Sequence, residues 1–130
     1  MRRCGEQVNM VGPKMILIID DDPAVCGELE HFLQGYGYAV TAAADSQQAF
    51  ACMEVMTPDL IFLDIIMPKT DGFTLAKKIR HDKRTATVPI IVFSAQENMR
   101  ELFAMEGLHD YLSKPLDYEK VLAAVRAKIG

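Results

Sequence analysis

Apolar residues in this chain gather in five short runs, and between the runs they recur every three or four positions. The runs are residues 15–19, 39–43, 60–63, 89–93 and 110–112. The first, third and fourth runs consist almost entirely of Ile, Leu, Val and Phe, which is typical of strands buried on both faces of a parallel sheet. Apolar residues at three- and four-residue spacing indicate amphipathic helices. The pattern therefore predicts five strands alternating with five helices.

Residues that can cap a helix stand before most of the helical segments. The candidate caps are Asp22, Asp45 or Ser46, Asp71 and Asp117. Their side chains can accept hydrogen bonds from the free N–H groups of a first helical turn. Pro23 suits the first turn of its helix, and Gly35 and Gly37 are expected to end that helix. The fourth helical segment, residues 97–105, is short and has a less regular apolar face.

Five successive strand–helix units predict a doubly wound α/β domain with a five-stranded parallel sheet over residues 15–130. Residues 1–14 lack this pattern and are expected to form an irregular N-terminal extension. A total of 130 residues suits one domain that can bury its own core.

Charge and composition narrow the function classes. Half of the residues are hydrophobic, a quarter are charged, and the formal net charge is −4. An acidic chain offers no general basic surface for a phosphate backbone, so we expect no nucleic-acid binding by this domain. No apolar run approaches the roughly 20 residues of a membrane span. Three cysteines, Cys4, Cys26 and Cys52, fit neither a disulfide framework nor a zinc pattern, and we expect buried or idle thiols in a cytoplasmic protein.

Residues with side chains that can bind ligands or react follow the ends of the predicted strands. The residues are Asp20, Asp21 and Asp22 after the first run, Asp64 after the third, Ser94 after the fourth and Lys114 after the fifth. Each has an ordinary structural explanation, such as a helix cap for Asp22 or a solvated surface lysine for Lys114. In a parallel α/β sheet, however, ligands bind beyond the carboxyl ends of the strands. Because all these groups fall at that edge, we expect a binding site there.

The clustered carboxylates indicate a divalent cation. Neighbouring carboxylates repel and raise one another's pKa unless a cation joins them. Oxygen ligands around an open position suit Mg²⁺, which also accepts phosphate oxygens. A carboxylate can itself attack phosphorus to give an aspartyl phosphate, with a lysine and a hydroxyl neutralising the phosphoryl oxygens. The residues thus predict phosphoryl chemistry.

Four sequence blocks resemble the receiver domain of two-component response regulators. They read "ILIIDDDP", "PDLIFLDIIMPKTDG", "VPIIVFSA" and "DYLSKP", in that order from Ile16 to Pro115. The resemblance covers nearly everything after Lys14. It implies the flavodoxin-like strand order 2-1-3-4-5.

The resemblance also implies roles for individual residues. Asp64 would be the phosphoacceptor, and Asp20, Asp21, Asp64 and the backbone carbonyl of Ile66 would bind Mg²⁺, or alternatively Mn²⁺. Ser94 and Lys114 would contact the phosphoryl group. A cis peptide bond would join Lys114 to Pro115.

Further implied positions concern the switch and the rim of the site. Ser94 and Tyr111 would form the switch, and Ile66, Met67 and Gln96 would line the rim. Thr70 and Leu108 depart from the family's common residues without removing a functional group. Because Ile66 offers no polar side chain to position a hydrolytic water, we hypothesise that it lengthens the phosphoryl lifetime relative to a polar residue at this position.

The implied partners are a sensor histidine kinase or a histidine phosphotransfer protein as donor. The face of the fourth and fifth helices would bind an output partner or a second copy of the chain. Since the acceptor is the protein itself, self-catalysed transfer and autodephosphorylation would not make it a turnover enzyme.

Other functions remain open at this point. A haloacid-dehalogenase-type phosphatase would carry a second aspartate where Ile66 stands, and a flavodoxin would not place three aspartates beside a flavin phosphate. The main alternative is a receiver-fold interaction module that works without phosphate.

Overall fold

The computed structural model describes residues 12–65, 67, 71–94, 108 and 110–130. Its strands are β1 (Met15–Ile19), β2 (Ala39–Ala43), β3 (Leu60–Asp64), β4 (Ile90–Ser94) and β5 (Asp110–Ser113). The helices among the described residues are α1 (Pro23–Gln34), α2 (Ser46–Val55), α3 (Gly72–His81) and α5 (Tyr118–Ile129). All strand pairs are parallel, in the order β2-β1-β3-β4-β5. This arrangement confirms the predicted doubly wound fold and its strand order.

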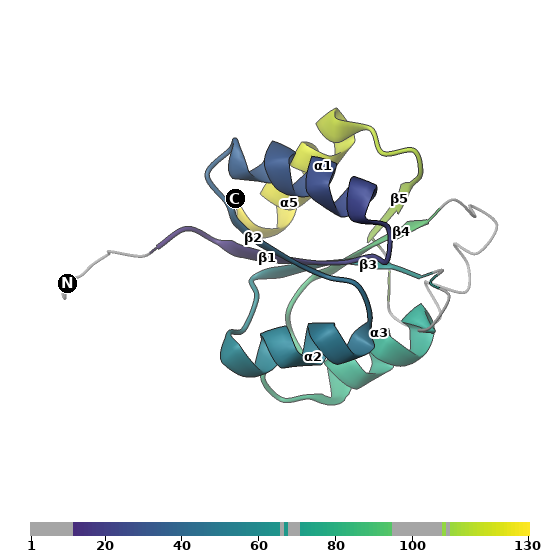
Figure 1. The fold of residues 1–130 in the computed structure, drawn as a ribbon. Coiled ribbons are helices and arrows are strands. Elements are labelled where there is room, and N and C mark those ends of the chain that lie inside the picture. The colour runs from purple at the N-terminus through teal and green to yellow at the C-terminus, as the bar shows by residue number, and fades with distance from the viewer. Residues whose placement is uncertain (1–11, 66, 68–70, 95–107, 109) are drawn as a thin grey trace.

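The sheet lies between two helical layers, with α1 and α5 on one face and α2 and α3 on the other (Figure 1). Alternate residues of the central strands point to opposite faces, so each strand serves both layers. Ile16, Ile18, Phe62 and Phe93 belong to the core on the α1/α5 side, whereas Leu17 belongs to the core on the α2/α3 side. Burial on both faces explains the continuous apolar runs.

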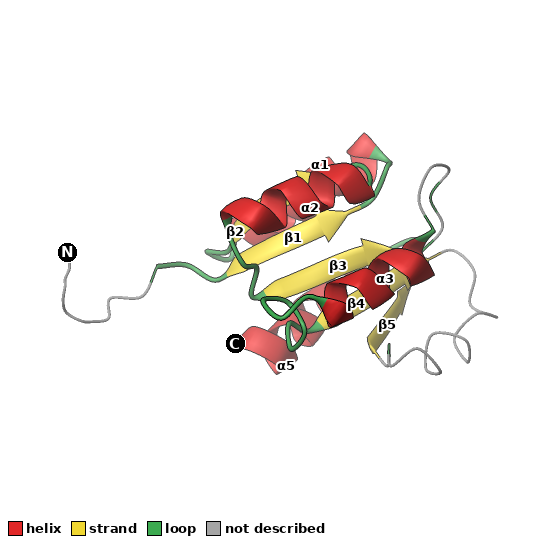
Figure 2. Ribbon diagram, turned by 90° about the horizontal axis from the view of Figure 1, so that it is seen from below, coloured by secondary structure: helices red, strands yellow, loops and turns green. Residues whose placement is uncertain are grey.

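Figure 2 shows β1 and β3 running side by side in the same direction. Because all the strand pairs are parallel, the carboxyl ends of the five strands lie at one edge. Strands β3, β4 and β5 each extend one residue beyond the predicted apolar runs, to Asp64, Ser94 and Ser113. The ladder continues because backbone pairing does not depend on side-chain polarity: Asp64 pairs with Phe93, and Ser94 with Ser113. Two of the predicted functional side chains are therefore held by the sheet itself.

Aspartate side chains cap the described helices as predicted. Asp22, Asp45, Asp71 and Asp117 accept hydrogen bonds from the backbone N–H groups of Ala24, Gln48, Phe73 and Glu119, respectively. Asp45, rather than Ser46, is thus the N-cap of α2. Gly35 keeps a right-handed conformation after α1, and the positive φ of 92° falls on Gly37. The predicted fourth helix, residues 97–105, lies outside the described residues.

Gly72, the first residue of α3, packs directly against the segment that follows β3. A β-carbon at this position would lie 2.5 Å from Ile65 Cα and 2.8 Å from Ile65 O. The Gly72 N–H also donates a hydrogen bond to Ile65 O over 3.3 Å. Only a glycine allows this approach, which brings α3 against the chain next to Asp64.

Candidate functional site

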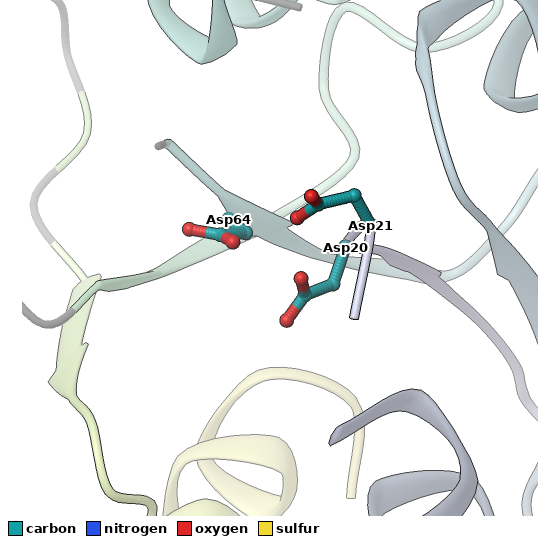
Figure 3. A group of neighbouring side chains, drawn as sticks. All are labelled: Asp20, Asp21 and Asp64. Atoms are coloured by element: carbon teal, nitrogen blue, oxygen red, sulfur yellow. The ribbon is translucent and has the colours of Figure 1, made fainter. Parts of the chain in front are cut away.

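Three carboxylates meet beyond the ends of β1 and β3 (Figure 3). Asp20 and Asp21 follow β1, and Asp64 is the last residue of β3. Each offers a carboxylate oxygen, and the three oxygens lie within 4.8 Å of one another. Asp20 and Asp64 are buried, with 1% and 3% of their surface exposed, whereas Asp21 is exposed. The strand ends thus assemble a partly open cluster of hard oxygen ligands.

Lys114 neutralises part of this negative charge. Its Nζ donates hydrogen bonds to Asp20 Oδ2 over 3.0 Å and to Asp64 Oδ2 over 3.2 Å. Asp20 is held from a second side, because its Oδ1 accepts a hydrogen bond from the Asp22 backbone N–H over 3.0 Å. The Lys114 backbone N–H donates to Ser94 O, and the Lys114–Pro115 bond is cis, as the resemblance implied.

The crowding changes the proton affinity of Asp64. Burial and the neighbouring Asp20 carboxylate raise the pKa of Asp64 to about 6, although Lys114 opposes the shift. Burial would lower the pKa of Lys114, but hydrogen bonding to Asp20 and the charges of Asp64 and Asp20 raise it overall. The metal-free site is therefore short of positive charge even with its lysine in place.

The predicted switch residues sit on the other side of the sheet edge. Ser94 ends β4 and is fully buried, and Tyr111 packs partly buried against the core on the α2/α3 side. By strand alternation, Ser94 and Tyr111 share that face, whereas Asp64 shares the α1/α5 face with Phe62. The Tyr111 hydroxyl donates a long hydrogen bond of 3.4 Å to Ser94 O. The two residues are thus in contact, and Tyr111 is folded towards β4.

The structure describes the rim of the site only in part. Met67 is buried in the core on the α2/α3 side. Ile66 and Gln96 lie outside the described residues, so the expected carbonyl ligand and amide stay predictions. Leu108, which departs from the family pattern, is also buried in that core, and Thr70 is not among the described residues.

One cysteine adjoins the site. Cys26 is buried on α1, and its Sγ donates to Asp20 O over 3.3 Å. Burial and the negative charges of Asp20 and Asp22 raise the pKa of this thiol to about 11. Cys52 is half-buried, and Cys4 is outside the described residues. The sequence predicted an idle thiol but not its contact with Asp20.

The sequence also missed a neighbour of Lys114. The Lys114 Nζ lies 5.0 Å from the centroid of the Phe93 ring, within the range of a cation–π contact. An aromatic residue directly before the strand-end hydroxyl was the available signal, but the apolar pattern marked Phe93 only as core.

The donor set fits Mg²⁺. Three oxygen ligands from carboxylates, one of them exposed, leave room for waters and substrate oxygens, which Mg²⁺ retains. Within the described part of the chain, this is the only group of three or more His, Cys, Asp or Glu residues arranged to hold a metal. The sheet edge thus combines an acidic cluster, a buried serine and an inward-pointing lysine.

Residues 16–126 match the family model described as the response regulator receiver domain. The chain belongs to this family. The match begins at the second residue of β1, includes β2 to β5, and contains every predicted site residue. It places the chain among the receiver domains of two-component response regulators, a family whose members interact with histidine kinases and bind Mg²⁺ at the acidic site.

Curated relatives include proteins about twice the length of the matched region and proteins of nearly the same length. The receiver domain is 42% identical over 114 residues to the DNA-binding dual master transcriptional regulator RpaA of Synechocystis, covering 86% of this chain and 47% of that protein. It is 32% identical over 117 residues to protein PilH of Pseudomonas aeruginosa, covering 88% of this chain and 97% of PilH. The chain therefore spans about half of a regulator such as RpaA.

Solved structures agree with the fold. A two-component response regulator from Clostridium difficile has a TM-score of 0.81 and 36% identity, covering 89% of this chain and 95% of that one. The receiver domain of sensor histidine kinase PA1611 from Pseudomonas aeruginosa has a TM-score of 0.82 and 31% identity, covering 92% and 99%. That structure holds a magnesium ion coordinated in its active-site cleft. Within the described ranges of this receiver, no helix is long and apolar enough to cross a membrane.

Proposed function

We propose that this receiver domain accepts a phosphoryl group on Asp64 from a phosphohistidine donor. The observation that carries the proposal is the contact of Lys114 with both Asp20 and Asp64 beside an exposed Asp21. It supplies an acceptor, a cation and an opening towards solvent in one place. The donor would be a sensor histidine kinase or a histidine phosphotransfer protein.

In the transfer, an Asp64 carboxylate oxygen forms a bond to phosphorus while the phosphorus–nitrogen bond of the donor breaks. The imidazole leaves with the electron pair of that bond. Mg²⁺, held by Asp20, Asp21, Asp64 and the expected carbonyl of Ile66, would neutralise charge on the phosphoryl oxygens. Mn²⁺ could replace it.

Lys114 and Ser94 would complete the charge neutralisation. The Lys114 ammonium already contacts Asp64 Oδ2, so a small displacement would let it pair with a phosphoryl oxygen. Ser94 ends the strand next to β3 and would donate its hydroxyl to another phosphoryl oxygen.

Movement of Ser94 would be transmitted through Tyr111, because the Tyr111 hydroxyl contacts the Ser94 carbonyl. We propose that these two residues bias a two-state equilibrium of the face made by the fourth and fifth helices. That face would bind an output protein or a second copy of the chain.

We further propose that the protein works in the cytoplasm and is not a turnover enzyme, since it modifies and later dephosphorylates its own aspartate. As the chain spans half of RpaA, a DNA-binding output would come from another domain or another protein. The acidic net charge of this chain supports an output without nucleic-acid contacts of its own.

Intact-mass measurement after incubation with acetyl phosphate and Mg²⁺ tests the acceptor. We expect the addition of one phosphoryl group, with acetate leaving, and none for Asp64→Asn or with a chelator. Asp22→Asn is the matched control, because asparagine also caps a helix and Asp22 is outside the acidic cluster. It should be phosphorylated like the parent.

Failure with acetyl phosphate leads to a second measurement, calorimetry with beryllofluoride. Binding that requires Mg²⁺ and Asp64 would support the site and point to a donor restricted to the partner protein. No phosphoryl gain and no beryllofluoride binding would contradict the proposal in favour of a phosphate-independent interaction module.

A further inference from the structure

The ammonium group of Lys114 faces an aromatic ring as well as two carboxylates. Its Nζ lies 5.0 Å from the centroid of Phe93. Phe93 is fully buried and contacts Phe62 edge to face, with ring centroids 6.1 Å apart and planes at 82°. A ring packed in this way has a fixed orientation, so it presents a defined surface to the cation.

Strand register puts this ring on the side of the phosphoacceptor. Phe93 pairs with Asp64 across β3 and β4, and paired residues of parallel strands point to the same face. Phe93 also packs in the α1/α5-side core with Phe62, which precedes Asp64 by two residues on that face. The ring therefore attracts the ammonium towards Asp64.

The ring differs from the carboxylates in what happens to it during the reaction. Asp64 turns from a carboxylate into an acyl phosphate, and an Asp20 oxygen would be shared with the metal. Phe93 neither titrates nor binds a metal. Of these three neighbours of Lys114, it is the one whose attraction is unchanged when phosphorus arrives.

We propose that Phe93 is a positioning residue for phosphoryl transfer to Asp64, acting through Lys114. Its ring holds the Lys114 ammonium beside Asp64 while the carboxylate contacts rearrange around the phosphoryl group. The inference rests on the proposed phosphoacceptor function. Phe93 itself touches no reacting atom.

The rate of phosphorylation by acetyl phosphate at saturating Mg²⁺ tests the role. Phe93→Leu should slow phosphorylation about three- to tenfold, the range expected for loss of a partly desolvated cation–π contact. Ile91→Val is the matched control, because Ile91 is fully buried on the same strand and the same face but is two residues from the cation contact. It should keep the parent rate. Phe93→Met, which also lacks the ring, replaces the leucine variant if that variant does not fold.

A double-mutant comparison separates positioning from general damage to β4. If Phe93 acts through Lys114, Phe93→Leu should change the rate by less than about 1.5-fold in a Lys114→Ala background. An undiminished loss in that background, or a Phe93→Leu rate equal to the parent rate, would overturn the inference.

A second measurement needs neither phosphate nor metal. A proton near the face of an aromatic ring is displaced in the NMR spectrum, so the Lys114 ε-methylene resonance should be shifted in the parent and in Ile91→Val, and should move to the position of an ordinary lysine in Phe93→Leu. An unshifted parent resonance would contradict the contact. A parent that shows the shift but takes up neither phosphoryl group nor beryllofluoride would refute the proposed function instead.

Discussion

Asp64 and Lys114 form a contact of 3.2 Å between a carboxylate that ends β3 and an ammonium that follows β5. The lysine must divide its charge, because Asp20 lies 3.0 Å away on the other side. One cation shared by two buried carboxylates leaves net negative charge at the site. This imbalance gives the metal-free domain a measurable pH dependence.

Replacing Asp64 should therefore stabilise the metal-free protein in a pH-dependent way. The folded-state pKa of Asp64, about 6, is above its ordinary value of 3.8, so the protonated group favours the folded state. This contribution is fully present below about pH 4 and is lost as the pH rises through 6. We expect the advantage of Asp64→Asn over the parent to grow by about 1–3 kcal/mol between pH 4 and pH 7. Urea unfolding in a chelator measures it, and a pH-independent difference would contradict the assigned repulsion.

Binding of Mg²⁺ should offset the net negative charge of the site and stabilise the folded protein. A cation that binds only the folded protein at 100 times its dissociation constant adds about 2.7 kcal/mol to the free energy of unfolding. Asp21→Asn should weaken Mg²⁺ binding at least about tenfold, since it removes one of three charged ligands. Thermal unfolding followed by circular dichroism is suitable, because the chain has no tryptophan.

The control for the magnesium measurement is again Asp22→Asn, which lies next to Asp21 but outside the oxygen cluster. It should keep the Mg²⁺-dependent rise in melting temperature. Equal losses in Asp21→Asn and Asp22→Asn would mean that the response reflects general electrostatics rather than a built site.

Cys26 should resist alkylation in the native protein. Its thiol is buried, and its pKa of about 11 leaves very little reactive thiolate near neutral pH. Iodoacetamide labelling followed by peptide mass analysis should show Cys26 modified in urea and spared without it. Native-state labelling as fast as in urea would show that α1 opens readily over Asp20.

Much of the fold could be predicted because its signals are local. Buried parallel strands give continuous apolar runs, and aspartates at helix starts satisfy free N–H groups, as Asp22 and Asp71 do. The residues at which the strands end were harder to predict from the sequence. Asp64 and Ser94 interrupt the apolar run, yet their backbones remain in the ladder. The pattern of apolar and polar side chains does not predict these hydrogen bonds, because they are made by the main chain.

The site, too, could be predicted from the sequence only in part. That the chemistry gathers at one edge follows from topology, because strands of a parallel sheet share their carboxyl ends. How Lys114 divides its contacts between Asp20 and Asp64 depends on side-chain positions from three separate strand ends. The place of Phe93 beneath that lysine depends on register between β3, β4 and β5. Such relationships are absent from any single segment of sequence.

The glycine at the start of α3 offers a test of how the fold supports the site. Gly72→Ala would bring a β-carbon to 2.5 Å from the Ile65 backbone, and the helix would have to move away from the segment after Asp64. We expect a loss of about 1–3 kcal/mol in the free energy of unfolding. Side-chain repacking cannot relieve the clash, because the clash involves backbone atoms. Gly27→Ala is the matched control: it lies within α1, a β-carbon there meets nothing within 4 Å, and alanine should stabilise the helix by about 0.5–1 kcal/mol. Urea unfolding of both variants should therefore give shifts of opposite sign, and a Gly72→Ala variant as stable as the parent, or more stable, would show that Gly72 is not needed for the close approach.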